Sequence, residues 1–268
     1  MHDFETLSRM MRQHAGPRPA GSGPASAGLP SRGLHEFHAA AADAVSLSGL
    51  ALGLAAQSGR RRPLLHVGRS LAEGETGPLH GMGLAEFGLD PARLLPVRLR
   101  DPVAVLQAAL EGAACAALDA VIVELWGEVR AYDLTASRRL ALAARNSGVP
   151  VFVLRVGAAA VASAAEARWQ VRAVPSVALA ANAPGRPAFD LTLLRARNGQ
   201  EGLRYHVEWD RALSKLVSRP LTGIAPDRDL ETGSGAAARR RAALPGAVVS
   251  LPVDRQGTPP SGPQRRAG

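Results

Sequence analysis

The chain has 268 residues, 46% of them hydrophobic, which is enough for one sizeable domain with a core of its own. Its 32 Lys and Arg against 23 Asp and Glu give a net charge of +9, but Lys215 is the single lysine, so the excess reflects an arginine-rich composition and is weak evidence for nucleic-acid binding. One cysteine excludes an intrachain disulfide, and the lack of an apolar run of about 18 residues or of an apolar leader predicts a cytoplasmic protein without a membrane span.

The first residues predict a short helix on a flexible tether. Phe4 and Leu7 fall on one face of a helix over residues 1–15, and residues 16–27 are rich in Pro, Gly and Ser. We expect the apolar stripe to bind a folded surface, either of its own core or of a partner. The alternative is a frayed terminus with no partner.

Between residues 29 and 172, strand-like and helix-like segments alternate. Strands are predicted at 34–38, 63–67, 93–99, 119–125 and 149–156, helices at 43–58, 101–117 and 132–147, and a poorly patterned stretch at 70–92. The last two strands are continuously apolar and rich in Val and Ile, as is typical of buried parallel strands. The repetition predicts an α/β fold with a mostly parallel sheet flanked by helices.

Two of these helices carry capping signals. Asp101, followed by Pro102, and Asp133 are suited to the N-cap positions of helices 101–117 and 132–147. Cys115 falls within an apolar run of the first helix and is predicted to be a small buried side chain.

The pattern changes toward the C-terminus. Residues 187–210 hold two alternating segments joined by RNGQEG, which predicts an antiparallel hairpin at the edge of the sheet. After it, Leu213, Leu216 and Val217 have a spacing that predicts one side of a helix, exposed and available to a partner. The composition of residues 212–268 predicts a disordered basic tail that contributes to partner binding.

The order of these elements resembles the core of RecA-type recombinases. Several stretches are closer to one degenerate branch of that group, among them GLPSRGLHEF (28–37), DAVIVELWGE (119–128) and YDLTASRRLALAARNSGVPVFVLR (132–155). They resemble the RecA-like accessory protein of bacterial inducible mutagenesis, usually called ImuA and sometimes labelled SulA-like. The resemblance covers residues 28–211 and implies a degenerate RecA-like domain there. It also implies a Y-family DNA polymerase-like partner, an indirect link to an error-prone DNA polymerase III alpha-type subunit, and the RecA recombinase as a further partner.

The segment that matches a phosphate-binding loop lacks the residues that such a loop needs. Backbone amides that wrap phosphate require glycines, the terminal phosphate is neutralised by a lysine, and Mg²⁺ takes a Ser or Thr hydroxyl. Val45 stands where the lysine would fall, and Ser46 is the one matching residue. Asp43 is expected to cap the following helix and so to repel a phosphate. The degenerate positions are Ala39, Ala42, Asp43, Val45 and Ser46.

Other positions of the resemblance also speak against catalysis. Glu124 matches the aspartate linked to Mg²⁺, and residual metal binding there stays open. The catalytic glutamate falls near Gly68 or Arg69, and the phosphate-sensing glutamine near Arg155. Arginine cannot accept a proton from water at neutral pH. We therefore expect no catalytic residue, no cofactor and no bound metal.

A few remaining side chains have both a structural and a functional interpretation. His35 and His38 should point to opposite faces of a strand, which disfavours a metal pair. His66 is expected to be a hydrogen-bonded core histidine. Ser137, beside two arginines, is expected on a solvated helix face and not as a nucleophile. Trp126 is expected to pack in the core or at its rim, with stacking on a base or a partner as the alternative.

Arginines near the predicted hairpin and in the tail predict weak, salt-sensitive and sequence-independent contact with DNA phosphates. These are Arg195, Arg197, Arg204, Arg239, Arg240 and Arg241.

The sequence thus predicts a non-catalytic interaction protein of a damage-inducible, error-prone translesion synthesis complex. Two alternatives stay open. One is a divergent ATPase of the P-loop type that acts on DNA, and the other is a cell-division inhibitor of the SOS response.

Overall fold

The computed structural model describes residues 32–219, except 59–60, 71–73, 75 and 177. The expected N-terminal helix with Phe4 and Leu7, the linker at 16–27, and the part of the tail that holds Arg239, Arg240 and Arg241 lie outside the described residues. Within the described ranges, no helix is both long enough and apolar enough to cross a membrane.

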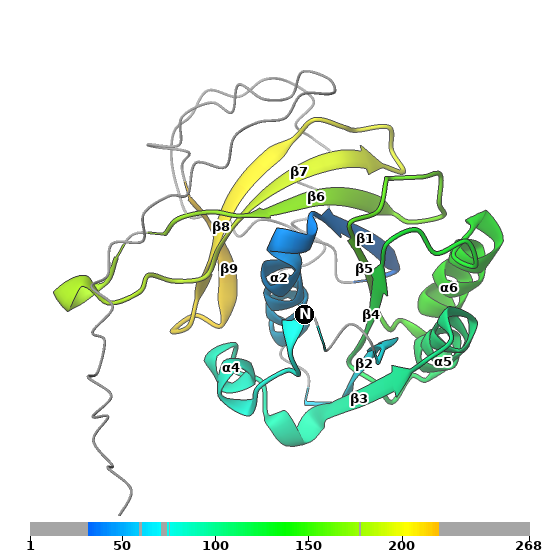
Figure 1. The fold of residues 1–268 in the computed structure, drawn as a ribbon, viewed down its shortest axis with the longest axis horizontal. Helices are drawn as coiled ribbons and strands as arrows, with labels where there is room; N and C mark the ends of the chain where they lie inside the picture. The colour runs from blue at the N-terminus through cyan, green and yellow to red at the C-terminus, as the bar shows by residue number, and fades with distance from the viewer. Residues whose placement is uncertain (1–31, 59–60, 71–73, 75, 177, 220–268) are drawn as a thin grey trace, which may run out of the picture. The chain divides into compact units, whose positions relative to one another are not determined.

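One mixed sheet forms the centre of the described domain (Figure 1). Its strands are β1 (Leu34–Ala39), β2 (Leu64–Arg69), β3 (Leu94–Leu99), β4 (Ala120–Trp126), β5 (Val151–Val156), β6 (Ala167–Ala173), β7 (Ala188–Ala196), β8 (Arg204–Asp210) and β9 (Lys215–Arg219). They lie in the order β3-β2-β4-β5-β1-β6-β7-β8-β9. Neighbours from β3 to β6 are parallel, and β7, β8 and β9 are antiparallel to their neighbours. The predicted α/β class and the antiparallel hairpin at the C-terminal edge are confirmed.

The connections between strands contain four α-helices and three short 3-10 turns among the described residues. They are η1 (Ala41–Asp43), α2 (Ala44–Ala56), α4 (Gly81–Glu86), η2 (Pro91–Arg93), α5 (Pro102–Ala114), α6 (Leu134–Ser147) and η3 (Ala180–Asn182). Asp101 accepts from the backbone amides of Val103 and Ala104, and Asp133 accepts from Ala136, so both predicted caps are confirmed.

Helix α2 is enclosed by the sheet on several sides. It contacts β1, β5, β6 and β9, and the strands curve around it in Figure 1. The apolar residues of α2 are distributed around the helix and not along one face. Such a helix needs cover on most of its sides, and Leu47 and Leu50 are accordingly fully buried. A Cβ on Gly53 would lie 3.3 Å from the Trp209 ring, so this glycine lets α2 approach β8 closely.

Helices α5 and α6 cover the opposite face of the sheet in a second core (Figure 1). Ala109 and Ala144 are fully buried where the two helices meet the strands. A Cβ on Gly112 would lie 2.4 Å from Leu65 Cδ2, so only glycine permits this helix to lie so near β2. The expected burial of Cys115 is wrong. Helix α5 ends at Ala114, and Cys115 is the exposed C-cap residue that follows it.

The helix predicted after residue 211 is wrong. A turn with a positive φ at Ser214 leads into β9, which pairs with β8 and places Leu216, with 0% exposed area, in the α2 core. Val217 is also buried, while Leu213 is 59% exposed. Leu216 and Val217 therefore do not form an exposed partner surface, and the sheet continues beyond residue 211 to Arg219.

Candidate functional site

Strands β2, β4, β5 and β1 are adjacent and parallel, so their carboxyl ends share one edge of the sheet. Open α/β sheets bind ligands at this edge. Glu124 pairs in register with Leu154, and Arg155 is the next residue of β5, so these two candidate residues point to opposite faces. Each belongs to a separate buried polar cluster.

The segment that resembles a phosphate-binding loop forms a tight turn into α2. Ala39 is the buried end of β1, the amide of Asp43 donates to Ala40 O, and Ala42 lies exposed in the 3-10 turn. Val45, which matches the position of the lysine in a phosphate-binding loop, is 66% exposed, and Ser46 beside it is half-buried. The turn therefore presents short apolar side chains at the sheet edge.

Asp43 does not act as predicted. Its side chain makes no capping hydrogen bond to α2, and its Oδ1 accepts instead from the backbone amide of Ala173 at 3.0 Å. The carboxylate turns away because the 3-10 turn precedes α2 and brings Asp43 next to the end of β6. Asp43 thus joins the start of α2 to β6, and the expected blockage by capping is wrong.

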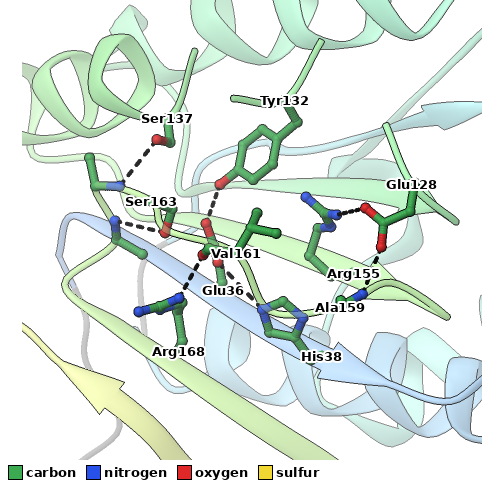
Figure 2. Close-up of polar contacts among 12 residues, drawn as sticks. Glu36, His38, Glu128, Tyr132, Ser137, Arg155, Ala159, Val161, Ser163 and Arg168 are labelled. Atoms are coloured by element: carbon green, nitrogen blue, oxygen red, sulfur yellow. Dashed lines mark hydrogen bonds and ion pairs between the residues drawn. The ribbon is translucent and has the colours of Figure 1, made fainter. Parts of the chain in front are cut away.

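One polar cluster lies on the α6 face of the sheet, and we call it the α6-face cluster: Glu36, His38, Glu128, Tyr132 and Arg155 (Figure 2). The Tyr132 hydroxyl donates to Glu36 Oε1 at 2.6 Å, and His38 Nε2 donates to Glu36 Oε2 at 3.4 Å. Burial disfavours a charge on Glu36, but hydrogen bonds from His38, Tyr132 and Ser163 outweigh it and lower the pKa of this carboxyl. Burial and the neighbouring Glu36 raise the pKa of Tyr132. The pair is therefore a carboxylate held by a neutral phenol.

Arg155 extends the same cluster toward the loop between β5 and β6. Its guanidinium carbon lies 5.1 Å from the centre of the Tyr132 ring, and Nη2 lies 3.7 Å from Glu128 Oε2. The other oxygen of Glu128 accepts from the amide of Ala159 in that loop at 2.8 Å. Figure 2 shows these side chains closing around the loop backbone. Arg155 is thus engaged in holding a loop.

Ser137 contributes to the same region and corrects a prediction. It is fully buried, its hydroxyl donates to Leu134 O at 3.0 Å, and it accepts from the amide of Ala164 at 3.1 Å. The residue is therefore not on a solvated helix face, although its two arginine neighbours are exposed. Arg168 donates to Val161 O at 2.6 Å and fixes the loop from its other side.

The second polar cluster, the α2-face cluster, consists of His66, Arg98, Glu124 and Trp126. Arg98 Nη2 donates to His66 Nδ1 at 2.9 Å, so the ring proton of His66 is on Nε2. Burial, assisted by the charge of Arg98, lowers the pKa of His66 to about 3, so the ring is neutral. Trp126 Nε1 donates to Glu124 Oε1 at 2.6 Å. The expectations of a hydrogen-bonded core histidine and of a packed Trp126 are confirmed.

This second cluster forms the polar end of a pocket of about 260 Å³. Helices α2 and α4 and the segment 76–80 form its other walls, which are mostly apolar. Within the described residues, His66 Nε2 has no hydrogen-bond partner and lies 3.6 Å from Glu124 Oε2. The pocket could not be predicted from the sequence, because one of its walls comes from the poorly patterned stretch at 70–92.

The predicted DNA-binding arginines near the hairpin do not form a bare basic patch. Arg197 Nη1 lies 2.7 Å from Glu166 Oε1, and Arg204 Nη2 lies 2.7 Å from Asp190 Oδ2. Arg195 is exposed. Because Arg204 pairs with a carboxylate and Arg197 shares Glu166 with Arg145, any attraction of these arginines to phosphate is reduced.

The histidines of β1 are separated as predicted. His38 lies in the α6-face cluster, whereas His35 donates from Nε2 to Arg32 O at 2.8 Å. Burial lowers the pKa of His35 to about 4. Among the described residues, no group of three or more His, Cys, Asp or Glu side chains could hold a metal ion.

Comparisons with known proteins give a likeness in structure. No family model matches the chain, and no curated protein matches it. Among solved structures, the chain is similar to the RadB recombinase, with 16% identity and a TM-score of 0.46. The similarity covers 67% of this chain and 88% of the RadB chain.

Proposed function

We propose that this protein is a non-catalytic, RecA-like accessory factor of a damage-inducible translesion synthesis complex and acts through protein contacts. The observation that carries the proposal is the segment from Ala39 to Ser46. It lies at the carboxyl end of a central parallel strand, the usual position of a phosphate site, yet it offers alanines and an exposed Val45 in place of glycines and a lysine.

The residues at the positions of a catalytic base and a phosphate sensor support the same proposal. Gly68 pairs in register with Glu124, and a Cβ on Gly68 would lie 3.2 Å from Glu124 Cβ. A carboxylate side chain at residue 68 would need its neighbour to shift. Arg69 donates to Arg100 O at 3.4 Å, and Arg155 is held by Glu128 and Tyr132. None of these three residues can take a proton from water at neutral pH.

The proposed partners follow from the resemblance to the ImuA group. They are a Y-family DNA polymerase-like protein, through it the error-prone DNA polymerase III alpha-type subunit, and the RecA recombinase. Because Leu216 and Val217 belong to the core, we now assign the C-terminal partner contact to residues 220–268 together with the exposed Leu213. The cytoplasm is the proposed compartment.

Co-purification tests this assignment. A tagged full-length chain and a chain ending at Arg219 are expressed in damage-treated cells with the Y-family polymerase-like protein. We expect the full-length chain to retain that protein and the shortened chain to stay folded but lose it. Retention by neither chain, or filamentous cells with an unchanged mutation rate, would contradict the translesion role and favour the division-inhibitor alternative.

A further inference from the structure

The pocket beneath α2 and α4 has a hydrogen-bonding end that the core does not satisfy. His66 is 2% exposed, its Nδ1 is used by Arg98, and its Nε2 has no partner among the described residues. A buried N–H without an acceptor lowers stability, so such a group favours any ligand that supplies an acceptor. The donor lies 3.6 Å from Glu124 Oε2, whose companion oxygen Oε1 accepts from Trp126.

This arrangement specifies the ligand's polar edge. Nε2 of His66 offers a proton, and Oε2 of Glu124 accepts one, side by side. A ligand must therefore carry an acceptor adjacent to a donor. This end holds the Glu124 carboxylate and the Arg98 guanidinium, whose opposite charges offset each other, so it favours an uncharged ligand.

The rest of the pocket favours a ligand whose remaining part is compact and apolar. Leu52, Leu79, Leu84 and Phe87 line it, and Ser48 adds a hydroxyl on α2. Its volume of about 260 Å³ lies just below the range of about 300–1,000 Å³ for sites that hold drug-sized ligands. A molecule of one or two rings fits this space.

We propose that the pocket binds a small uncharged heterocycle of the nucleobase class, whose N–H donates to Glu124 Oε2 and whose neighbouring ring acceptor receives the proton of His66 Nε2. Proteins read an unpaired base in this manner, by hydrogen bonds to its pairing edge and by packing its ring between aromatic and apolar side chains. This inference stands apart from the accessory role, since it concerns the pocket and not residues 220–268.

Titration calorimetry on the full-length chain, with two matched ligands, tests the proposal. The probes are 9-methyladenine, which has the donor and acceptor, and 9-methylpurine, which keeps the ring and lacks any N–H. We expect 9-methyladenine to bind at least about ten-fold more tightly, the effect of losing one buried hydrogen bond. Adenosine monophosphate should bind more weakly than the base because a pocket of about 260 Å³ has no room for its ribose and phosphate beside the ring.

Two pocket variants and one control separate binding from folding. In Glu124→Gln, Trp126 keeps the amide oxygen, so the amide NH₂ faces the ligand's amino group, and affinity should fall at least about ten-fold. Gly83→Leu fills the pocket from α4, where an added Cβ meets nothing within 4 Å, and should abolish binding. Glu36→Gln makes the same chemical change in the α6-face cluster and should leave affinity unchanged.

The results that would overturn the proposal are equally definite. They are a dissociation constant for 9-methyladenine above about 1 mM, equal affinity for 9-methylpurine, or binding that survives both pocket variants. Failure of the base to bind would leave the co-purification test of the accessory role unaffected.

Discussion

The two polar clusters lie on opposite faces of the sheet, the α6-face cluster on β1 and β5 and the α2-face cluster on β2, β3 and β4, and they differ in what covers them. In the α6-face cluster, Glu36 and Arg155 reach partners on the 127–133 turn and the 157–166 loop, so polar bonds fix connections. In the α2-face cluster, His66 and Glu124 face a pocket, and the Nε2 proton of His66 meets no acceptor among the described residues. The same sheet edge thus holds a structural network on one face and a candidate binding site on the other.

The difference follows from what covers each face. Helix α6 and its flanking turns bring Tyr132 and Glu128 onto the α6-face cluster. On the other face, helix α4 has six residues and lines the pocket with Gly83 and Leu84. Among the described residues both clusters keep buried nitrogens without a partner, His38 Nδ1 and Arg155 Nε on the α6 face and His66 Nε2 on the α2 face, but His66 is the one that lines a pocket.

The largest expected effect tests whether β9 completes the α2 face. Leu216→Ala should lower the free energy of unfolding by about 2–5 kcal/mol, because it leaves a cavity in a core position. Leu213→Ala, in the turn before β9 and exposed, should change it by less than about 0.5 kcal/mol. Urea denaturation measures both, and equal effects would show that β9 does not belong to this core.

The next largest effect tests the closed cluster. Tyr132→Phe removes the hydroxyl that donates to Glu36 Oε1 and leaves a buried carboxylate oxygen unpaired, at a cost of about 1–3 kcal/mol of stability. Tyr205→Phe, at a half-buried tyrosine of the other core, is the control and should cost less. If Tyr132→Phe has no measurable effect, the cluster does not stabilise the fold.

A smaller effect concerns pH and the neutral histidine of the open cluster. The folded pKa of His66, about 3, lies below its ordinary value of 6.5, so between these values the unfolded chain binds a proton that the folded chain does not. Stability should therefore fall as the pH falls through this window, by at most about 1.4 kcal/mol per pH unit for this histidine. His35, with a pKa of about 4, acts in the same direction.

The variant His66→Phe isolates that contribution. Its unfolding free energy at pH 6 and pH 5 should differ by about 1.2 kcal/mol less than that of the unchanged chain. An unaltered pH slope would mean that His66 is protonated in the folded protein, and the hydrogen bond from Arg98 to an unprotonated Nδ1 would lose its basis.

The smallest expected effect concerns the phosphate-loop position. Val45→Lys restores the lysine at an exposed position, so stability should change by less than about 0.5 kcal/mol. ATP binding should not appear, since the glycines that would expose the loop amides are still missing. Equilibrium dialysis with labelled ATP checks this, and tight binding by the variant would show that the turn can adapt to phosphate.

The regular elements were predictable because their signals are local. The apolar runs of β4 and β5 and the caps Asp101 and Asp133 depend on neighbouring residues, and all of them occur as predicted. The spacing of Leu213, Leu216 and Val217 suits a helix but also a turn followed by a strand. The strand forms because it covers a side of α2, and such a tertiary contact cannot be read from the local pattern.

The sites were less predictable because they depend on strand order. Glu124 and Arg155 were both identified as candidates, but their separation onto two faces required the register of β4 against β5. The pocket joins Val45, His66 and Glu124, which lie on three segments distant in sequence. Asp43 has the residue type of a cap, yet the 3-10 turn gives it another partner.

The proposal that this sheet edge neither binds nor hydrolyses ATP is tested most directly by titrating the full-length chain with ATP and Mg²⁺ while phosphate release is followed. We expect no saturable heat and no phosphate release above the uncatalysed rate, since the segment from Ala39 to Ser46 offers neither lysine nor glycine. A dissociation constant below about 10 µM, or hydrolysis that Glu124→Gln abolishes, would contradict it and establish the divergent ATPase instead.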